Sequence, residues 1–258
     1  MIKNFFLKLY IYLKKKYFGF KNINKEDIIQ NSNNKHYNYK RLLNLIISKN
    51  EVFKKRKQIN LGKYKIFKKI FKTKKLINVL DVGGGGGHKF YEFSKIFKNN
   101  FFWYNYETRS LIKLLKKKLS NEKRLKHIDN LRKIKNKIDL MFCDSSFQYI
   151  DNQEKFLDKL IGLNPKYFYL SRTFMNHLDK NQLCVMQETL LSENGPGKLE
   201  NYIDDQIISY PCFLYPRFSF KKKLSLKYRL IYFSLDYSDF IIINRKKYFS
   251  HEFLYIKK

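Results

Sequence analysis

Downstream of about residue 75, short apolar runs alternate with stretches in which apolar residues recur every three or four positions. Strands buried on both faces are near-continuous apolar runs, whereas helices that cover a sheet show the longer period. The strands that this pattern predicts are 76–80, 101–106, 125–128, 137–143, 167–170, 230–235 and 253–256. The helices that it predicts between them are 89–97, 111–119 and 152–163. The alternation therefore predicts an α/β domain over 76–258, with a seven-stranded, mostly parallel sheet flanked by helices.

The first 75 residues show helical patterns and no strand pattern, so they are predicted to form an N-terminal helical extension. Helices are expected near the start of the chain and at 39–53 and 64–71. Apolar residues between Ile2 and Leu13 recur at helical spacing among several lysines. Such a helix either lies on an anionic membrane surface, through residues 1–17, or packs on the α/β domain with its lysines in water. Packing is favoured, because buried helices share the same periodicity.

Residues 176–225 interrupt the regular alternation of strands and helices. They contain three of the four prolines of the chain and the sequence Gly195-Pro196-Gly197. Long irregular connections in compact domains are commonly functional, and this one follows the end of a predicted strand. We interpret it as an insertion over the strand ends and a candidate substrate lid.

Composition says little about partners. The chain has 54 Lys and Arg against 22 Asp and Glu, a formal net charge of +32, which favours an anionic partner such as nucleic acid. However, it contains no alanine and few Gly and Pro, which is the usage that AT-rich coding produces. Much of the lysine is thus explained without a partner, and nucleic acid is not favoured.

Cysteines and apolar segments bear on the compartment. Cys143, Cys184 and Cys212 are far apart and lack metal-ligand spacing, so we expect free thiols in a reducing compartment and no metal site. No uncharged apolar stretch is long enough to span a bilayer, and Lys8 interrupts the apolar run at the start. We expect a cytoplasmic protein; contact through residues 1–17 would place it at the inner face of the membrane.

Half of the ten glycines stand together at 83–87, directly after the first predicted strand. Glycine permits positive φ and close approach of a ligand, and a helix that follows offers free N–H groups. Asp81, Gly83, Gly85 and Gly87 fit the pattern acid-x-G-x-G-x-G, whereas the dinucleotide pattern G-x-G-x-x-G would end at His88. A purely structural turn is the weaker alternative, so the spacing predicts a cofactor site.

The acid-and-glycine pattern resembles motif I of class I S-adenosylmethionine-dependent methyltransferases, whose fold is Rossmann-like. The resemblance implies S-adenosyl-L-methionine as cofactor, with Asp81 near its methionine amino group and Asp129 near its adenine amino group. Glu107 ends the second predicted strand, where a carboxylate can accept both ribose hydroxyl hydrogens. NAD enzymes share that feature, so Glu107 predicts a nucleoside cofactor without choosing one. The alternative interpretation of Glu107 is a solvated carboxylate at a strand end, and that of Asp129 is an incidental position among many charges.

The loops after the fourth and fifth predicted strands carry the candidate catalytic residues. Ligands of open α/β sheets bind beyond the carboxyl ends of the strands, so Ser145 is expected against the cofactor. Asp144 and His177 are candidate proton acceptors, Tyr149 could orient the acceptor, and Arg172 could bind an acidic group on it. Structural alternatives stay open: His177 at the surface, Arg172 paired with a neighbouring carboxylate, and Tyr149 capping the core.

A further set of motifs resembles a bacterial methyltransferase family encoded among genes for cell-surface polysaccharide and lipopolysaccharide synthesis. The motifs are Leu80–Gly85, Glu107, Ser145–Ile150, Arg172-Thr173, Val185–Gln187, Ser209–Pro211 and a terminal strand led by Phe253. The resemblance covers most of the chain from about Tyr17 and implies a sugar or glycan precursor as methyl acceptor. The family commonly has Asp-Arg-Thr-Pro after the fifth strand. Here Ser171 replaces the acid and Phe174 the proline, which puts a catalytic role for that carboxylate in doubt.

Other functions stay open beside this one. Basic charge and abundant aromatic residues favour RNA methylation, but no added RNA-binding module is visible, nor the Asp/Asn-Pro-Pro-aromatic signature of amino-group methylases. A non-catalytic scaffold that keeps the fold is a second alternative, and an NAD-dependent oxidoreductase, which fits the glycine spacing less well, is a third. The sequence leaves the oligomeric state open.

Overall fold

The computed structural model describes residues 2–24, 40–55, 65–71, 75–97, 100–118, 122–195 and 205–258. Residues 196–204 of the predicted lid lie outside this described part of the chain.

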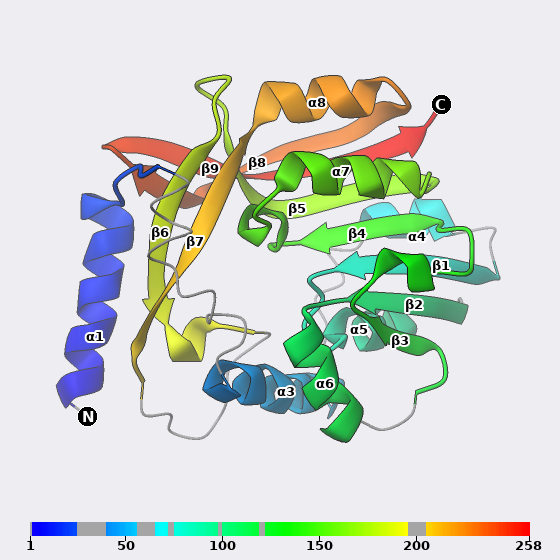
Figure 1. The fold of residues 1–258 in the computed structure, drawn as a ribbon, viewed down its shortest axis with the longest axis horizontal. Helices are drawn as coiled ribbons and strands as arrows, with labels where there is room; N and C mark the ends of the chain where they lie inside the picture. The colour runs from blue at the N-terminus through cyan, green and yellow to red at the C-terminus, as the bar shows by residue number, and fades with distance from the viewer. Residues whose placement is uncertain are drawn as a thin grey trace.

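Nine strands of the described residues form one sheet, and seven of them follow in the order β3-β2-β1-β4-β5-β9-β8 (Figure 1). These seven strands are β1 (Leu76–Val82), β2 (Asn100–Tyr106), β3 (Leu125–Ile128), β4 (Leu140–Asp144), β5 (Tyr167–Asn176), β8 (Tyr228–Ile243) and β9 (Lys246–Lys257). Strands β1 to β5 are parallel, and β9 runs antiparallel to both of its neighbours, β5 and β8. The prediction of an α/β, Rossmann-like, mostly parallel sheet is confirmed.

Helices cover both faces of this sheet, as the connections between parallel strands require. Those with residues in the apolar clusters against the sheet are α4 (Lys65–Phe71), α5 (His88–Ile96), α7 (Gln153–Gly162) and α8 (Arg217–Ser225), while α6 (Arg109–Lys118) contacts β3. α3 (Lys40–Lys55) packs against α5 and α6 instead. Phe67 of α4 packs in one apolar cluster, whereas Leu157 of α7 and Phe220 of α8 pack in another. The sheet separates the two clusters. Successive side chains of a strand point to opposite faces, so in β4 Phe142 belongs to the first cluster and Met141 to the second.

The predicted lid contains two more strands that sequence analysis did not assign. β6 (Leu183–Leu190) and β7 (Ile207–Pro216) form an antiparallel hairpin, and β7 joins the sheet by pairing with Met175 and Asn176 of β5. The described part of 176–225 therefore divides into a hairpin beyond the end of β5 and the helix α8, which returns to the core.

The N-terminal helices are built into the same molecule rather than set apart from it. Phe67 and Phe71 of α4 are 0% and 3% exposed beneath the sheet. Leu42 and Leu43 of α3 are buried in a cluster with residues of α6 and β7. The first helix, α1 (Ile2–Leu13), lies beside β6 (Figure 1). The boundary predicted at residue 76 thus coincides with the start of the sheet, but residues on both sides of it pack in the same core.

Candidate active site

The carboxyl ends of β1, β2 and β4 border a cavity of about 790 Å³. Cavities of this size commonly hold small ligands or cofactors. Glu107, Asp144 and Ser145 line it from the strand ends, together with residues of the glycine turn. Leu42 and Ile46 of α3 form another part of the wall. A cavity thus lies beyond the strand ends, where the cofactor site was expected.

Every second glycine of the turn adopts a backbone conformation that other residues disfavour. Gly83, Gly85 and Gly87 have φ of 69°, 58° and 85°, in the left-handed region that side chains disfavour. A Cβ on Gly83 would lie 2.3 Å from the Cβ of Ser146. A Cβ on Gly85 would meet only Ile46 Cγ2, at 3.5 Å, and Gly85 lines the cavity. The turn therefore presents bare backbone to the cavity while packing tightly behind it.

Asp81 lies behind the glycine turn and is not part of the cavity wall. Its side chain is 1% exposed, and its Oδ2 accepts a hydrogen bond of 3.1 Å from the indole Nε1 of Trp103. Burial raises its pKa from 3.8 to about 8. A Cβ on Gly84 would lie 2.3 Å from the same oxygen, so Asp81 and the turn fit closely. Its place near the methionine amino group stays a prediction.

Glu107 lies on the cavity wall, directly after β2. Its Oε1 accepts a hydrogen bond of 2.8 Å from the Gly85 N–H, and its Oε2 accepts one of 3.0 Å from the Thr108 N–H. Burial nevertheless raises its pKa to about 7. The structure thus joins the end of the second strand to the glycine turn, and each carboxylate oxygen has further lone pairs to offer a ligand.

Asp129 lines the cavity after β3, at the expected place. Asp129 forms ion pairs with Lys133 and with the exposed Arg109, the latter at 3.5 Å. These cations lower the pKa of Asp129. The carboxylate is therefore ionised at the rim of the cavity. It can accept a hydrogen bond from a ligand only alongside these cations.

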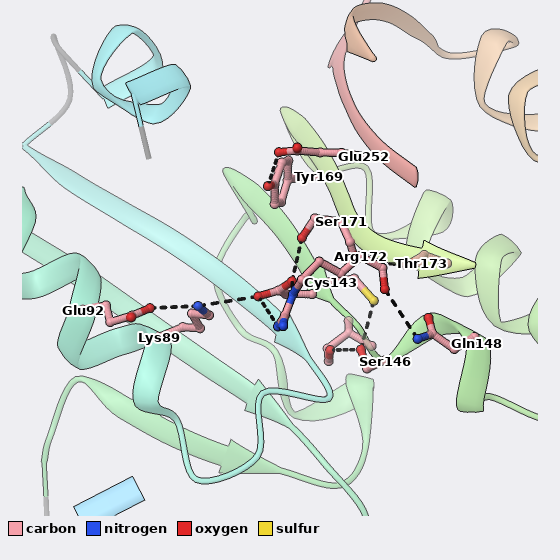
Figure 2. Close-up of polar contacts among 12 residues, drawn as sticks. Lys89, Glu92, Cys143, Ser146, Gln148, Tyr169, Ser171, Arg172, Thr173 and Glu252 are labelled. Atoms are coloured by element: carbon pink, nitrogen blue, oxygen red, sulfur yellow. Dashed lines mark hydrogen bonds and ion pairs between the residues drawn. The ribbon is translucent and has the colours of Figure 1, made fainter. Parts of the chain in front are cut away.

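Asp144 is the centre of an ion-pair network on the wall of the cavity; Figure 2 labels the other members, Lys89, Glu92, Ser171 and Arg172. Its side chain is 4% exposed. Arg172 donates to both of its oxygens, from Nε at 2.6 Å and Nη2 at 2.9 Å, and the Ser171 hydroxyl donates at 2.8 Å. Lys89 of α5 lies 3.5 Å from it and 2.8 Å from Glu92. The chain of charges runs from Glu92 through Lys89 and Asp144 to Arg172.

A β-bulge brings Arg172 to this network. Ser171 and Arg172 together oppose the single residue Glu252 of β9, and Arg172 has φ of 46°. Bulges re-aim side chains near functional sites, and here the guanidinium is turned to Asp144. Pairing with a neighbouring carboxylate, the structural alternative for Arg172, is present in the structure.

Ser145 and Ser146 connect the end of β4 to its neighbours. Ser145 lines the cavity with φ of 62°, and its N–H donates to the Ser171 carbonyl at 2.9 Å. The Ser146 hydroxyl donates to the Val82 carbonyl at 2.5 Å and lies 3.1 Å from Cys143 Sγ. The loop is therefore tied to both β1 and β5.

Tyr149 and His177 have different positions relative to the cavity. Tyr149 lines it, and its hydroxyl donates to Gln187 Oε1 at 3.4 Å; burial raises its pKa, so the phenol is neutral. His177 is not on the cavity wall and contacts the rings of Tyr248 and His251. β5 continues through Asn176, so His177 is roughly 16 Å of extended chain beyond Arg172.

Several wall residues had no signal in the sequence analysis. They are Leu42, Ile46, Lys89 and Glu92. Lys89 could have been found, because it is the second residue of the helix that follows the glycine turn. α3 reaches the cavity only through tertiary packing, which no local pattern reveals. Glu193 to Gly195 and Tyr210 belong to the segment interpreted as a lid, but none of them was singled out as a wall residue.

Comparisons with known proteins give similarities of fold. No family model matches the sequence, and no curated protein matches it. Glycopeptide N-methyltransferase MtfA, solved with sinefungin, is 12% identical over 83% of this chain and 96% of its own, with a TM-score of 0.49. An S-adenosylmethionine-dependent methyltransferase from Clostridium acetobutylicum is 14% identical over 91% and 99%, with a TM-score of 0.43. The 1,6-didemethyltoxoflavin-N1-methyltransferase from Burkholderia thailandensis is 11% identical over 91% and 87%, also with a TM-score of 0.43.

Proposed function

We propose that this protein is an S-adenosylmethionine-dependent methyltransferase that acts on a sugar or glycan precursor in cell-envelope polysaccharide biosynthesis. One observation carries the cofactor assignment. The N–H of Gly85 and the carboxylate of Glu107 meet at 2.8 Å, and both residues line the cavity. A bare glycine backbone beside an acidic strand end is the arrangement that binds a ribose at this edge of a sheet.

Strand direction and glycine geometry favour this cofactor over NAD. The dinucleotide fold adds a sixth parallel strand beyond the fifth, whereas here the antiparallel β9 lies between β5 and β8. The left-handed glycines are Gly83, Gly85 and Gly87, and His88 stands where the dinucleotide pattern has its last glycine.

The residues on the wall suit the groups of this cofactor. Both Glu107 and Asp129 line the cavity, so Glu107 can accept from the ribose hydroxyls and Asp129 from the adenine amino group. Lys89 and Asp144 offer opposite charges for the carboxylate and amino groups of the methionine portion. When bound, the cofactor supplies an activated methyl group on a sulfonium. The chain itself supplies binding, orientation and exclusion of water, which are the main demands of an in-line displacement.

The contacts of Asp144 suit positioning better than proton acceptance. A carboxylate that is paired with Arg172 and Lys89 is stabilised in its charged form and is a weak base. It holds both cations at the cavity, where Arg172 can bind an acidic group of the acceptor. Tyr149, as a neutral phenol on the wall, can hold an acceptor hydroxyl. His177 is given no part in this proposal because it lies off the cavity.

Two features support a sugar as the acceptor. The motifs around Ser145–Ile150 and Arg172-Thr173 resemble those of polysaccharide-associated methyltransferases. In addition, Tyr149 and Tyr210 form an aromatic corner on the wall, with ring centroids 5.1 Å apart, and Glu193 lines the same cavity. Aromatic faces pack on the C–H surfaces of sugar rings, and carboxylates accept from their hydroxyls.

Calorimetric titration tests the cofactor first. The protein should bind S-adenosylhomocysteine in preference to NAD, and Glu107→Ala should weaken that binding about tenfold or more, the worth of hydrogen bonds to a charged group. Glu154→Gln, which changes a carboxylate that is 66% exposed on α7, is the matched control and should bind normally. Preference for NAD would overturn the assignment.

Turnover is tested separately with labelled S-adenosylmethionine and nucleotide-activated or lipid-linked sugars. Methylation of one of these acceptors supports the second half of the proposal. Methylation of RNA in their place would replace the acceptor and keep the cofactor. Cofactor binding without any turnover across both acceptor classes would favour a scaffold that retains the fold.

A further inference from the structure

Helix α1 carries an apolar face that the described part of the chain leaves in solvent. Phe5, Phe6, Leu9 and Tyr12 are 64%, 61%, 40% and 52% exposed. The helix is followed by a π-helical turn, Lys14–Phe18, whose last two residues are also exposed aromatics. A surface helix of a globular protein normally shows the reverse arrangement, with polar residues outward.

The opposite face fastens α1 to the protein in one orientation. Ile11 is 2% exposed against the body of the molecule. Glu188 of β6 accepts from the Tyr10 hydroxyl at 3.1 Å and forms an ion pair with Lys14 at 2.6 Å. Phe20 then pairs with Ile243 of β8. The apolar face is thus a fixed part of the surface, and Figure 1 shows α1 at the edge of the molecule.

The charged residues of α1 and of the segment that follows it are all basic, although Glu188 and Glu193 of the body pair with Lys14 and Lys15. Residues 2–24 contain six lysines, at positions 3, 8, 14, 15, 16 and 21, and no aspartate or glutamate. Lys8 and Lys16 are exposed beside the apolar residues. A helix with exposed aromatic and aliphatic residues flanked by lysines is the type that lies in the plane of a membrane interface. Anionic headgroups attract such lysines.

Length and charge argue against other occupants. α1 has 12 residues, too few to cross a bilayer, and no helix among the described residues is long and apolar enough to do so. In a second copy of the chain the exposed Lys8 and Lys16 would meet lysines of the same sign, and α1 itself supplies no carboxylate to pair with them, which is unfavourable. An anionic lipid surface matches both the apolar residues and the lysines.

We propose that α1 and the Lys14–Phe18 turn form an interfacial anchor that docks the protein on the surface of an anionic phospholipid bilayer. The exposed face of α1 enters the boundary between headgroups and acyl chains. Lys15 also forms an ion pair of 2.7 Å with Glu193, a residue of the cavity wall. A helix is about 10–12 Å across with its side chains. With α1 lying between the cavity wall and the lipid, docking would hold Glu193 roughly one helix diameter from the membrane surface. This inference goes beyond methyl transfer and does not depend on it.

Vesicle co-sedimentation of the full-length protein tests the anchor. The probes are vesicles of phosphatidylcholine alone and of phosphatidylcholine with phosphatidylglycerol, at low and high salt. We expect binding to the anionic vesicles that weakens with salt. The double variant Phe5→Ser/Phe6→Ser should bind more than about tenfold more weakly. Lys8→Glu/Lys16→Glu should lose roughly fivefold or more for each lysine.

The matched control is Phe218→Ser/Leu226→Ser, which removes two exposed apolar side chains, 63% and 76% exposed, near α8. It should bind like the unmodified protein. Thermal unfolding checks that every variant is folded. Equal binding by the Phe5/Phe6 variant would overturn the proposal. So would a dimer in sedimentation velocity that this variant abolishes, because a second copy would then cover the face. Neither readout uses the cofactor, so failure of the methyltransferase assignment would leave this test intact.

Discussion

At the scale of single residues, Glu107 makes cofactor binding dependent on pH. Burial raises its pKa from 4.5 to about 7, so the carboxyl gains a proton as the pH falls below neutrality. The protonated acid is a poorer acceptor for two ribose hydroxyls. We predict that affinity for S-adenosylhomocysteine decreases below pH 7, by up to about tenfold per pH unit.

Calorimetry between about pH 6 and about pH 8 measures this dependence across the raised pKa. Glu107→Gln should bind weakly at every pH and show a flat profile. Glu154→Gln serves as the control and should keep the pH dependence of the unmodified protein, because that carboxylate is exposed on α7 and off the cavity wall. A steady affinity in the unmodified protein would contradict the assignment of Glu107 to the ribose.

Asp81 predicts a separate effect, on stability. Its pKa rises from 3.8 to about 8 on folding, mainly through burial. The folded state therefore keeps a proton that the unfolded state releases, and stability is lost as the pH rises from about 4 to about 8. Asp81→Asn removes this titration and can still accept the Trp103 hydrogen bond. We expect its melting temperature to fall less across that range than in the unmodified protein; parallel profiles would contradict the raised pKa.

Residues with a local signal could be predicted from the sequence, and residues placed by distant contacts could not. Gly85 and Glu107 were found because a left-handed turn and a strand end leave marks in neighbouring positions. The structure places both on the cavity wall. Asp144 was expected as a base because it directly follows the fourth predicted strand. Its pairing with Arg172, 28 residues away, depends on a bulge in β5 that no local pattern showed.

At the scale of elements, one buried lysine joins α3 to the hairpin. Lys49 is 1% exposed, and its ammonium donates to the carbonyls of Ser192 and Asn194, each at 2.6 Å. Burial lowers the pKa of Lys49, whereas the charges of Asp205 and Glu193 act to raise it. Asn194 lines the cavity, so this contact holds part of the wall in place.

We predict that Lys49→Met destabilises the protein by roughly 1–3 kcal/mol, because two part-buried carbonyls lose their donor. It should also weaken S-adenosylhomocysteine binding. Lys55→Met, at an exposed position at the end of the same helix, should change neither property. Urea denaturation and calorimetry measure the two effects. Loss of stability with normal binding would show that the contact supports the fold without shaping the cavity.

Element boundaries were predictable where apolar runs end abruptly. β1 and β2 match expectation within two residues because Gly and Glu-Thr follow them. The last two strands were expected at 230–235 and 253–256 but span Tyr228–Ile243 and Lys246–Lys257. A bulge between Asp236 and Phe240 breaks the alternation that would have marked the longer strand. The hairpin of β6 and β7 was missed because it pairs mainly with itself, beyond the sheet.

At the scale of the whole molecule, the helical extension and the α/β domain share one core. Phe67 of α4 is 0% exposed, and its ring lies 5.4 Å from that of Phe93, 6.1 Å from Phe142 and 4.9 Å from Tyr169. These partners belong to α5, β4 and β5. The boundary at residue 76, drawn from sequence patterning alone, therefore separates residues that pack together.

Two N-terminal truncations test which helices of the extension the α/β domain needs in order to fold. Removing Phe67 and Phe71 takes away two buried rings, each worth roughly 3–5 kcal/mol, against a typical domain stability of about 5–15 kcal/mol. We predict that residues 76–258 alone will not unfold cooperatively. A chain that begins at Gly19 loses only α1 and its turn, whose outer face is exposed, and should keep a cooperative transition. Thermal unfolding with near-ultraviolet circular dichroism measures both. Cooperative unfolding of 76–258 would mean that α3 and α4 are dispensable to the sheet and serve the cavity alone.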